Sequence, residues 1–347
     1  MDEKLLTFIP KLHFPHSILT GQKSLLFFKA ISTKKKTFIV SKAFHEKNHD
    51  LVKQLVNDSP LFIQTGEPTI EVFQHFQKVL QKHDSDYLIA IGGGSVIDLV
   101  KLLKKDIHIP MVAIPTTIGS GAEVSQYSLL IGANSKQVTA SSLLLPEVVI
   151  INPNFFKSLS REQIIYQSID ALSHAIESLV SRSANHLSDT LALSSLNDLY
   201  TQLTELSDNV AMTDSLLERI KISSTLAGLA QSSAATGLVH AFAHYFGAHN
   251  GIAHAQAISV FLLDVLALNA QHTDRYQKLN GLKNLSEKKF ISKLDLLLHK
   301  LNVPLPKVAL HESIEIAAKK IKADICTITN PWSPDIADII AIIKQRT

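Results

Sequence analysis

The sequence has little cysteine and little charge, and it has no long apolar run. Its 347 residues include one cysteine, Cys326, which excludes an internal disulfide framework and fits a reducing compartment. Charged residues make up 19% of the chain and the net charge is +3, with lysines spread along it, so no nucleic-acid partner is expected. The longest apolar stretch, 257–270, is interrupted by Asp264 and is too short to span a bilayer, so no membrane partner is expected.

The N-terminal residues also lack the features of a secretory signal. Residues 1–15 hold early acidic side chains and prolines in place of an apolar core, and we therefore expect a cytoplasmic protein. Hydrophobic residues make up 46% of the chain, which is enough for a substantial buried core.

The sequence pattern changes near residue 153. Before that point, short β-branched apolar runs alternate with helical patterns such as 69–83, which predicts buried parallel strands. The predicted strands are 37–40, 61–64, 87–91, 111–114 and 148–151, and 127–131 with 137–140 form a predicted antiparallel pair. We therefore predict an α/β dinucleotide-binding domain with a parallel sheet over residues 1–153.

After Pro153 the strand signals nearly disappear. The predicted helices are 161–180, 187–206, 214–231, 237–246, 254–268, 286–301, 311–321 and 335–344. This pattern predicts an all-α metal- and substrate-binding domain over residues 154–347.

A glycine-rich turn follows the predicted strand 87–91. Gly92, Gly93, Gly94 and Ser95 lead into a helical pattern, and Ser95 is expected to cap that helix. Glycines let a pyrophosphate approach the backbone, and the free N–H groups of a helix start favour phosphate. The spacing differs from G-x-G-x-x-G, so a phosphate site and a plain strand-to-helix turn both stay open.

A second polar loop, 115–123, follows the next predicted strand and contains Thr116 and Thr117. Loops at the carboxyl ends of parallel strands are where α/β proteins bind ligands. A solvated polar loop is the alternative, and two such loops on adjacent strands favour a ligand site.

Asp170 and His174 are four residues apart in a helical pattern, so they share one helix face. A surface ion pair would give the same spacing. The neighbouring residues are apolar, however, and a buried carboxylate and imidazole each need a partner.

His240 and His244 also share a helix face, and that helix is expected to end near Gly247. The turn Asn250-Gly251 and the start of the next helix at His254 let His240 and His254 face one centre. Together with Asp170 and His174 they would give one carboxylate and three neutral imidazoles, which suit Fe, Zn or Ni rather than Mg or Ca. Core histidines bonded to backbone groups are the alternative.

These blocks resemble the iron-containing (group III) alcohol dehydrogenases, which have the dehydroquinate synthase-like fold. GGGSVIDLVK at 92–101 is similar to that family's GGGSxxDxAK, and PTTIGSGAEVS at 115–125 to PTTxGTGSEVT. Residues 170–177 are similar to D-A-x-x-H-A-x-E, and His240, His244 and His254 to H-x-x-x-H-x(9)-H-G. The resemblance covers nearly the whole chain.

The resemblance implies roles for individual residues and a homodimer. It implies that Asp170, His174, His240 and His254 bind a divalent metal, Fe2+ or alternatively Zn2+, while His244 relays a proton near the nicotinamide. It implies that Gly92, Gly93, Gly94 and Ser95 hold the pyrophosphate of NAD or NADP, with Asp98 by the nicotinamide, Thr116 and Thr117 in the cofactor cleft and Lys136 near the ribose. His249 has no counterpart and is taken as structural or pocket-lining.

Three departures from the family pattern concern the pocket and the cofactor. Trp332 stands where arginine is usual, and Ala255 replaces the glycine after the last histidine. Lys42 stands where many relatives carry the aspartate that binds the adenosine 2′-hydroxyl, so NADP(H) is expected to be accepted at least as well as NAD(H).

The resemblance implies reversible hydride transfer between a nicotinamide and a small alcohol or aldehyde. Three alternatives stay open: a lyase or cyclase of the dehydroquinate synthase type, a maleylacetate reductase-like enzyme, and an inactive metal- or nucleotide-binding relative. The sequence identifies neither the substrate nor the metal.

Overall fold

The computed structural model describes residues 11–132, 136–280 and 282–347, and the chain forms two compact units. One unit contains residues 13–160 and 212–225, and the other contains the remaining described residues. Helix α9 (Asp214–Ala234) contributes residues to both units. The predicted domain boundary at residue 153 stays a prediction.

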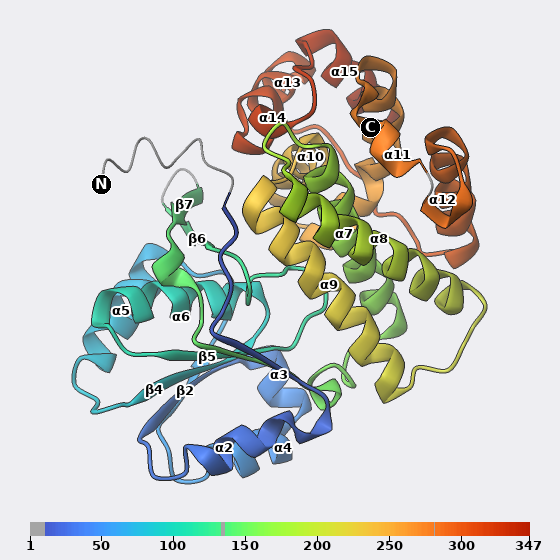
Figure 1. Ribbon diagram of the computed structural model, residues 1–347. Helices are drawn as coiled ribbons and strands as arrows, with labels where there is room; N and C mark the ends of the chain where they lie inside the picture. Colours follow the sequence, from blue (N-terminus) through green and yellow to red (C-terminus); the bar gives the residue numbers. More distant parts are fainter. Residues whose placement is uncertain (1–10, 133–135, 281) are drawn as a thin grey trace. The chain divides into compact units, whose positions relative to one another are not determined.

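The first unit is built on a six-stranded parallel sheet with the order β1-β8-β5-β4-β2-β3 (Figure 1). The strands are β1 (Ser17–Thr20), β2 (Lys36–Ser41), β3 (Leu61–Gln64), β4 (Tyr87–Gly92), β5 (Met111–Pro115) and β8 (Val148–Ile151). The predicted parallel α/β architecture is therefore confirmed. Strand β1 was not predicted, because its four residues are largely exposed or half-buried and carry no continuous apolar run.

Helices cover both faces of this sheet. In Figure 1, α5 (Ile70–Leu80) and α6 (Gly94–Ile107) lie on one side, and α2 (Phe27–Ala30), α3 (Lys42–Lys47) and α4 (His49–Val56) on the other. On the side of α3 and α4, Phe38 and Ile89 of the sheet pack in one cluster with Phe44 and Val52. Because the central strands are buried on both faces, they read as continuous apolar runs in the sequence.

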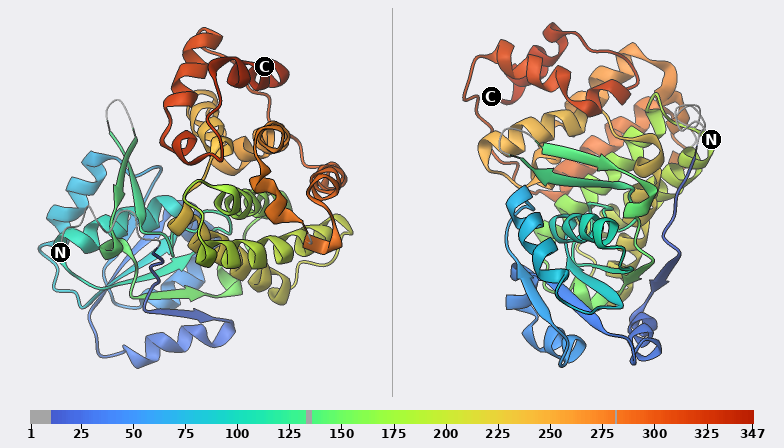
Figure 2. Two further views of the ribbon diagram at one scale, coloured as in Figure 1. Left: turned by 45° about the horizontal axis from the view of Figure 1, so that its top comes forward. Right: turned by 90° about the vertical axis from the view of Figure 1, so that its left-hand side faces the viewer.

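A hairpin of two antiparallel strands, β6 (Tyr127–Ile131) and β7 (Lys136–Ala140), is separate from this sheet (Figure 2). The predicted antiparallel pair is thus confirmed. The unit also contains short 3-10 helices at Gln22–Leu26 (η1), Ser142–Leu144 (η2) and Pro153–Phe155 (η3).

The second unit is helical, as predicted. Helix α7 (Arg161–Val180) is buried along most of its length and packs against α8 (His186–Ser207) and α11 (His254–His272). Helix α10 (Leu238–Asn250) packs against α11, α13 (Ile314–Ala323) and α14 (Ile325–Thr329). The remaining elements are η4 (Asp274–Leu279), η5 (Leu282–Asn284), α12 (Glu287–Leu301) and α15 (Ile336–Arg346). Among the helices of the described residues, none has the length and apolar character that a bilayer-spanning segment requires.

Two of the predicted helix boundaries that differ from the structure lie beside the candidate sites. Helix α10 continues through Gly247 to Asn250, and its C-cap is Gly251, whose φ of 63° lies in the left-handed region that glycine adopts without strain. Helix α6 begins two residues earlier than predicted, with Gly93 as N-cap, so Ser95 is its second residue and not its cap.

Candidate metal and cofactor sites

Three predicted imidazoles of the helical unit lie near one carboxylate oxygen of Asp170. Oδ1 of Asp170 lies 3.8 Å from Nε2 of His174, 3.8 Å from Nε2 of His240 and 3.7 Å from Nε2 of His254. These distances exceed a hydrogen bond. Donors bound at about 2.0–2.2 Å to one tetrahedral ion lie roughly 3.3–3.6 Å apart. The donor atoms of Asp170, His174 and His240 all lie within 4.8 Å of one another, which fits three ligands of a common ion. The distance from His254 to Asp170 makes His254 the candidate fourth ligand.

The local structure explains how these side chains meet. Asp170 and His174 are one turn apart on α7, and His240 lies in the first turn of α10. Gly251 then ends α10 and His254 starts α11, so the chain returns to the same centre after a short turn. The rings of His174 and His240 stack with their centroids 4.6 Å apart.

The electrostatics of this cluster also fit a cation. Within the described residues, the buried atoms Oδ1 of Asp170 and Nε2 of His240 have no hydrogen-bond partner. Burial, together with the nearby charge of Glu177, raises the pKa of Asp170 to about 7, and burial lowers the pKa of His240 to about 3. A divalent metal ion binds donors of this kind, namely a neutral imidazole and a carboxylate that has no cationic partner.

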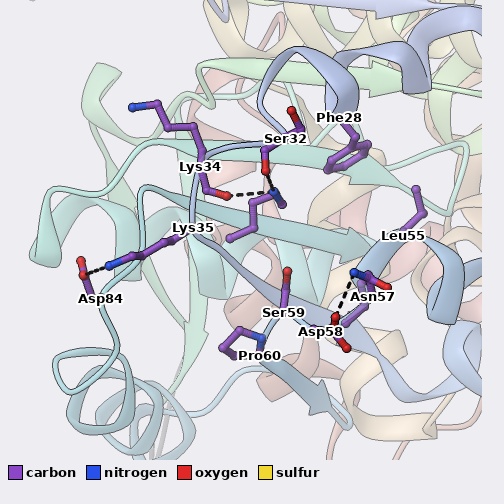
Figure 3. A pocket seen from close by; sticks show the side chains of 12 residues that line it. Phe28, Ser32, Lys34, Lys35, Leu55, Asn57, Asp58, Ser59, Pro60 and Asp84 are labelled. Carbon is purple, nitrogen blue, oxygen red and sulfur yellow. Dashed lines mark hydrogen bonds and ion pairs between the residues drawn. The ribbon is translucent and has the colours of Figure 1, made fainter.

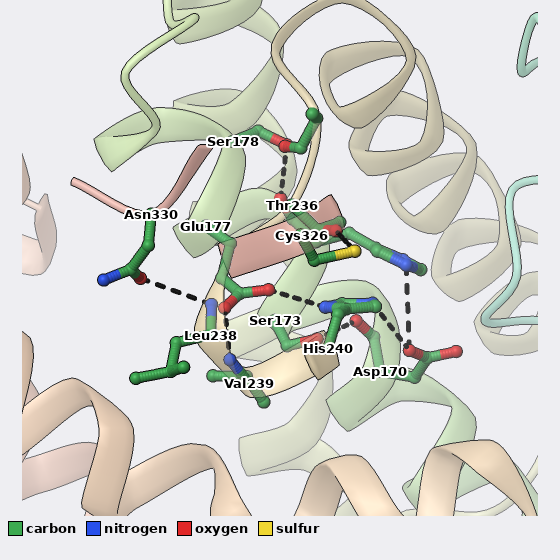
Figure 4. Close-up of polar contacts among 12 residues, drawn as sticks. Asp170, Ser173, Glu177, Ser178, Thr236, Leu238, Val239, His240, Cys326 and Asn330 are labelled. Carbon is green, nitrogen blue, oxygen red and sulfur yellow. Dashed lines mark hydrogen bonds and ion pairs between the residues drawn. The ribbon is translucent and has the colours of Figure 1, made fainter. Parts of the chain in front are cut away.

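A second buried carboxylate, that of Glu177, holds the first turn of α10 (Figure 4). One of its oxygens accepts the backbone N–H of Val239 at 2.7 Å, and the other lies 2.5 Å from Nδ1 of His240. This contact leaves Nε2 of His240 to face Asp170. Outer carboxylates that orient ligand histidines in this way are a regular part of metal sites.

The two other histidines of the predicted cluster lie outside these four. The ring of His244 stacks on that of His254, with centroids 5.6 Å apart, and its Nδ1 lies 3.0 Å from Oδ2 of Asp324. The ring of His249 stacks on that of Tyr245, and its Nδ1 lies 2.7 Å from the Tyr245 carbonyl oxygen. The structure thus separates His249, which packs within its own helix, from His244, which lies beside the cluster.

In the α/β unit, the predicted glycine turn leads from β4 into α6 next to the loop that follows β5. A Cβ added to Gly93 would lie 2.9 Å from Cγ2 of Thr117, whereas one added to Gly94 would meet nothing closer than 3.6 Å. The hydroxyl Oγ1 of Thr117 is buried and, within the described residues, has no hydrogen-bond partner. Thr116 is also buried. A glycine turn at the start of a helix, beside an unsatisfied hydroxyl, fits the approach of a phosphate-bearing cofactor.

Three further predicted cofactor residues lie on α6, α3 and β7. The carboxylate oxygens of Asp98 bind Nζ of Lys101 and the backbone N–H of Leu129, each at 3.2 Å, so Asp98 ties α6 to the hairpin. Lys42 is exposed and begins α3, directly after the carboxyl end of β2. Lys136 begins β7, and its side chain lies outside the described part of the chain.

An ion pair that sequence reasoning missed supports the loop after β5. Nζ of Lys221 lies 2.7 Å from Oε1 of Glu123, with both side chains fully buried, and it also donates to the Ile118 carbonyl at 3.1 Å. Thr225 donates to the same oxygen of Glu123 at 3.0 Å. Helix α9 thus holds this loop in place through Lys221 and Thr225. The two members of the ion pair are far apart in the sequence, so no local sequence pattern marks them.

A pocket of about 520 Å3 lies at the other edge of the same sheet (Figure 3). Its lining includes Lys36 at the start of β2 and Pro60 just before β3. The strands are parallel, so these amino ends lie opposite the edge that carries the glycine turn. Of the described residues that line this pocket, none is a predicted site residue.

Both halves of the sequence match one protein family. Residues 15–153 match the family described as iron-containing alcohol dehydrogenase, and residues 164–347 match the C-terminal part of the Fe-containing alcohol dehydrogenase family. The chain belongs to the iron-containing alcohol dehydrogenase family. The resemblance inferred from the sequence blocks is confirmed.

Individual curated relatives agree with this family assignment. The aldehyde-alcohol dehydrogenase 2 of Entamoeba histolytica is 29% identical over 303 residues, which cover 76% of this chain and 34% of that protein. A 4-hydroxybutyrate dehydrogenase of Clostridium kluyveri is 28% identical over 263 residues, which cover 68% of this chain and 70% of that protein. The chain therefore matches only about a third of the length of the Entamoeba protein.

A solved structure shows the same fold. The iron-containing alcohol dehydrogenase of Thermococcus thioreducens superposes with a TM-score of 0.84 at 25% sequence identity, covering 97% of this chain and 99% of that one. The family architecture of an α/β unit followed by a helical unit is therefore shared along nearly the whole chain.

Proposed function

We propose that this family member transfers a hydride reversibly between a nicotinamide cofactor and a small alcohol or aldehyde. In this proposal Asp170, His174, His240 and His254 hold one divalent metal. The observation that carries it is the near-equal spacing of three imidazole Nε2 atoms from one oxygen of Asp170. Family membership supports the same reaction and does not favour the lyase or cyclase alternative.

We propose Fe2+ as the metal, in line with the family description, and the same donors also suit Zn2+. A bound metal of this kind supplies Lewis acidity toward a carbonyl or alkoxide oxygen, and the nicotinamide supplies or accepts the hydride. One carboxylate and three neutral imidazoles leave net positive charge at the centre, where negative charge develops on the substrate oxygen. His254 keeps 41% of its side chain exposed, which leaves this side of the cluster open to solvent.

For the cofactor, we propose that Gly92, Gly93, Gly94 and Ser95 receive the pyrophosphate, with Thr116 and Thr117 beside them. The hydroxyl of Thr117, which has no hydrogen-bond partner within the described residues, supports this placement. Lys42 would then lie where a 2′-phosphate is bound, so we propose that NADP(H) is accepted at least as well as NAD(H). The roles of Asp98 and Lys136 beside the cofactor stay predictions, as does the homodimer.

A panel of aldehydes tests the reaction. The purified protein would be loaded with Fe2+ or Zn2+, its metal content measured, and the absorbance of NADH and NADPH followed with each aldehyde. The panel should include anionic aldehydes such as phosphonoaldehydes. We expect one metal per chain and consumption of the reduced cofactor with at least one aldehyde. A fully loaded protein that oxidises neither cofactor with any aldehyde would contradict the proposal.

A further inference from the structure

His244 and Asp324 form a contact that lies outside the four proposed metal ligands. Nδ1 of His244 lies 3.0 Å from Oδ2 of Asp324, and both side chains are largely but not fully buried. Asp324 is the N-cap of α14, where its other oxygen accepts the backbone N–H of Cys326 at 2.8 Å. One carboxylate oxygen therefore fixes the carboxylate to the helix start, and the other is left for the imidazole.

The geometry of this pair is that of a hydrogen bond. His244, Asp324 and Cys326 offer atoms close enough together to suggest a second metal site. The separation of 3.0 Å, however, is the usual length of an N–H···O bond, and it is shorter than the spacing of ligands around one tetrahedral ion. Burial acts to raise the pKa of Asp324, but the hydrogen bond and the charge of His244 outweigh it and lower that pKa. Asp324 is therefore an ionised carboxylate that accepts a hydrogen bond from the ring.

A carboxylate acceptor decides which nitrogen of His244 carries the proton. An ionised carboxylate only accepts, so Nδ1 must donate, and a neutral imidazole then keeps its lone pair on Nε2. The ring stacks on His254 and stands edge-on to His240, with centroids 5.6 Å and 6.3 Å away. Nε2 of His244 is thus the basic atom of a ring that lies against the candidate metal ligands.

We infer that Asp324 is a positioning residue that acts through His244. Its carboxylate fixes the tautomer with the proton on Nδ1, so that Nε2 exchanges the substrate proton. This inference rests on the proposed function. In alcohol oxidation the hydroxyl O–H bond breaks, the proton passes to Nε2, and the hydride leaves the carbon for the nicotinamide. In aldehyde reduction the same proton returns to the oxygen as the hydride arrives.

The tautomer can be measured without turnover. Side-chain nitrogen NMR of the Zn2+-loaded, histidine-labelled protein reports which ring nitrogen is protonated, and His244→Ala assigns the signal. We expect the proton on Nδ1 in the wild type. In Asp324→Asn we expect an additional population with the proton on Nε2, because an amide can turn either its oxygen or its nitrogen to the ring. A wild-type His244 with its proton on Nε2 would overturn the inference, whether or not an aldehyde substrate is known.

The kinetic test asks whether Asp324 acts through His244. Asparagine is as good an N-cap as aspartate, so Asp324→Asn should fold. We expect kcat to fall about 10- to 100-fold, as for outer residues that orient a functional histidine, with KM and metal content nearly unchanged. Asp324→Asn combined with His244→Ala should be no slower than His244→Ala alone.

The matched control is Asp335→Asn, which alters another helix-capping aspartate, at the start of α15. We expect this variant to keep wild-type kcat. Equal losses in the two Asp→Asn variants would show a capping effect. Losses from Asp324→Asn and His244→Ala that multiply in the double variant would show that Asp324 acts independently of His244. Either result would overturn the inference.

Discussion

The carboxylate of Glu177 forms hydrogen bonds both to the side chain of His240 and to the backbone N–H of the preceding residue, Val239. Asn330 adds a further bond by accepting the N–H of Leu238 at 3.2 Å. The first turn of α10 is therefore fixed by two buried polar side chains, that of Glu177 on α7 and that of Asn330 at the end of α14. The ring of His240 has one nitrogen committed to Glu177 and the other directed to Asp170.

This arrangement predicts that Glu177→Gln weakens metal binding while the fold is kept. A glutamine has the same shape, but its amide can donate to Nδ1 of His240 and so move the ring proton to the nitrogen that faces the metal. Removal of such outer carboxylates costs about 10- to 100-fold in metal affinity. Competition with a chelator measures the effect. Ser173→Ala is the control, because it removes only a hydroxyl bonded to the Asp170 carbonyl. Unchanged affinity in Glu177→Gln would show that Glu177 does not orient the ligand.

His254→Ala should abolish both metal binding and turnover without unfolding the metal-free protein. His254 is the most exposed of the four proposed ligands, and substitutions at exposed positions usually change stability by less than about 0.5 kcal/mol. Metal analysis, circular dichroism and thermal unfolding of the metal-free protein are the measurements. His249→Ala, whose ring packs on Tyr245, should retain the metal. A His254→Ala protein with full metal content and near-normal turnover would remove His254 from the ligand set.

The glycine turn gives a test of cofactor binding that is separate from stability. Gly94→Ala adds a Cβ with no contact closer than 3.6 Å, so we expect an unchanged melting temperature. If the pyrophosphate lies over this residue, the Cβ occupies its approach, and the KM for the cofactor should rise about tenfold or more. Gly93→Ala should lose stability as well, since its Cβ would lie 2.9 Å from Thr117. An unchanged cofactor KM in Gly94→Ala would place the pyrophosphate elsewhere.

Sequence reasoning succeeded where a single element or a short turn determines the geometry. Asp170 and His174 share a face of α7 by their spacing, and His240 and His254 are brought together by a turn at Gly251. Glu177 lies on the same helix, seven positions after Asp170, and its spacing would have placed it on that face. No role was predicted for Glu177, and helical spacing alone does not distinguish a buried carboxylate from a solvated one.

Sequence reasoning failed where contacts join elements that are distant in sequence. It also failed where a single backbone angle determines the residue at which a helix ends. Asp324 reaches His244 from the start of another helix, and Lys221 reaches Glu123 from α9, so no local periodicity marks either pair. Gly247 and Gly251 both look like helix ends in the sequence. Only Gly251 has the positive φ of a C-cap, while Gly247 is tolerated inside α10 at a cost of roughly 1 kcal/mol.

The choice between NADP and NAD can be tested at Lys42. This side chain is exposed, and among the described residues it pairs with the equally exposed Glu46, with the two charged atoms 3.8 Å apart. Its replacement should therefore not disturb the fold. Lys42→Asp should lower kcat/KM for NADPH more than for NADH, because a carboxylate repels a 2′-phosphate and accepts a 2′-hydroxyl. Lys47→Asp, at the other end of the same short helix, is the charge-matched control. An equal loss with both cofactors, or a wild type that strongly prefers NADH, would contradict the assignment.

The single cysteine offers a test that depends on pH. Burial raises the pKa of the Cys326 thiol well above its usual value, and the negative charge of Asp324 adds to this shift. A raised pKa lowers the fraction of reactive thiolate at any pH below it, so the folded protein should react slowly with iodoacetamide at about pH 8 and faster as pH rises. The unfolded protein should react at the ordinary rate of a free cysteine. Asp324→Asn removes the neighbouring charge and should speed the reaction in the folded state, while Asp335→Asn should leave it unchanged. A folded wild type that reacts as fast as the unfolded chain would show that neither the packing around the thiol nor Asp324 slows its reaction.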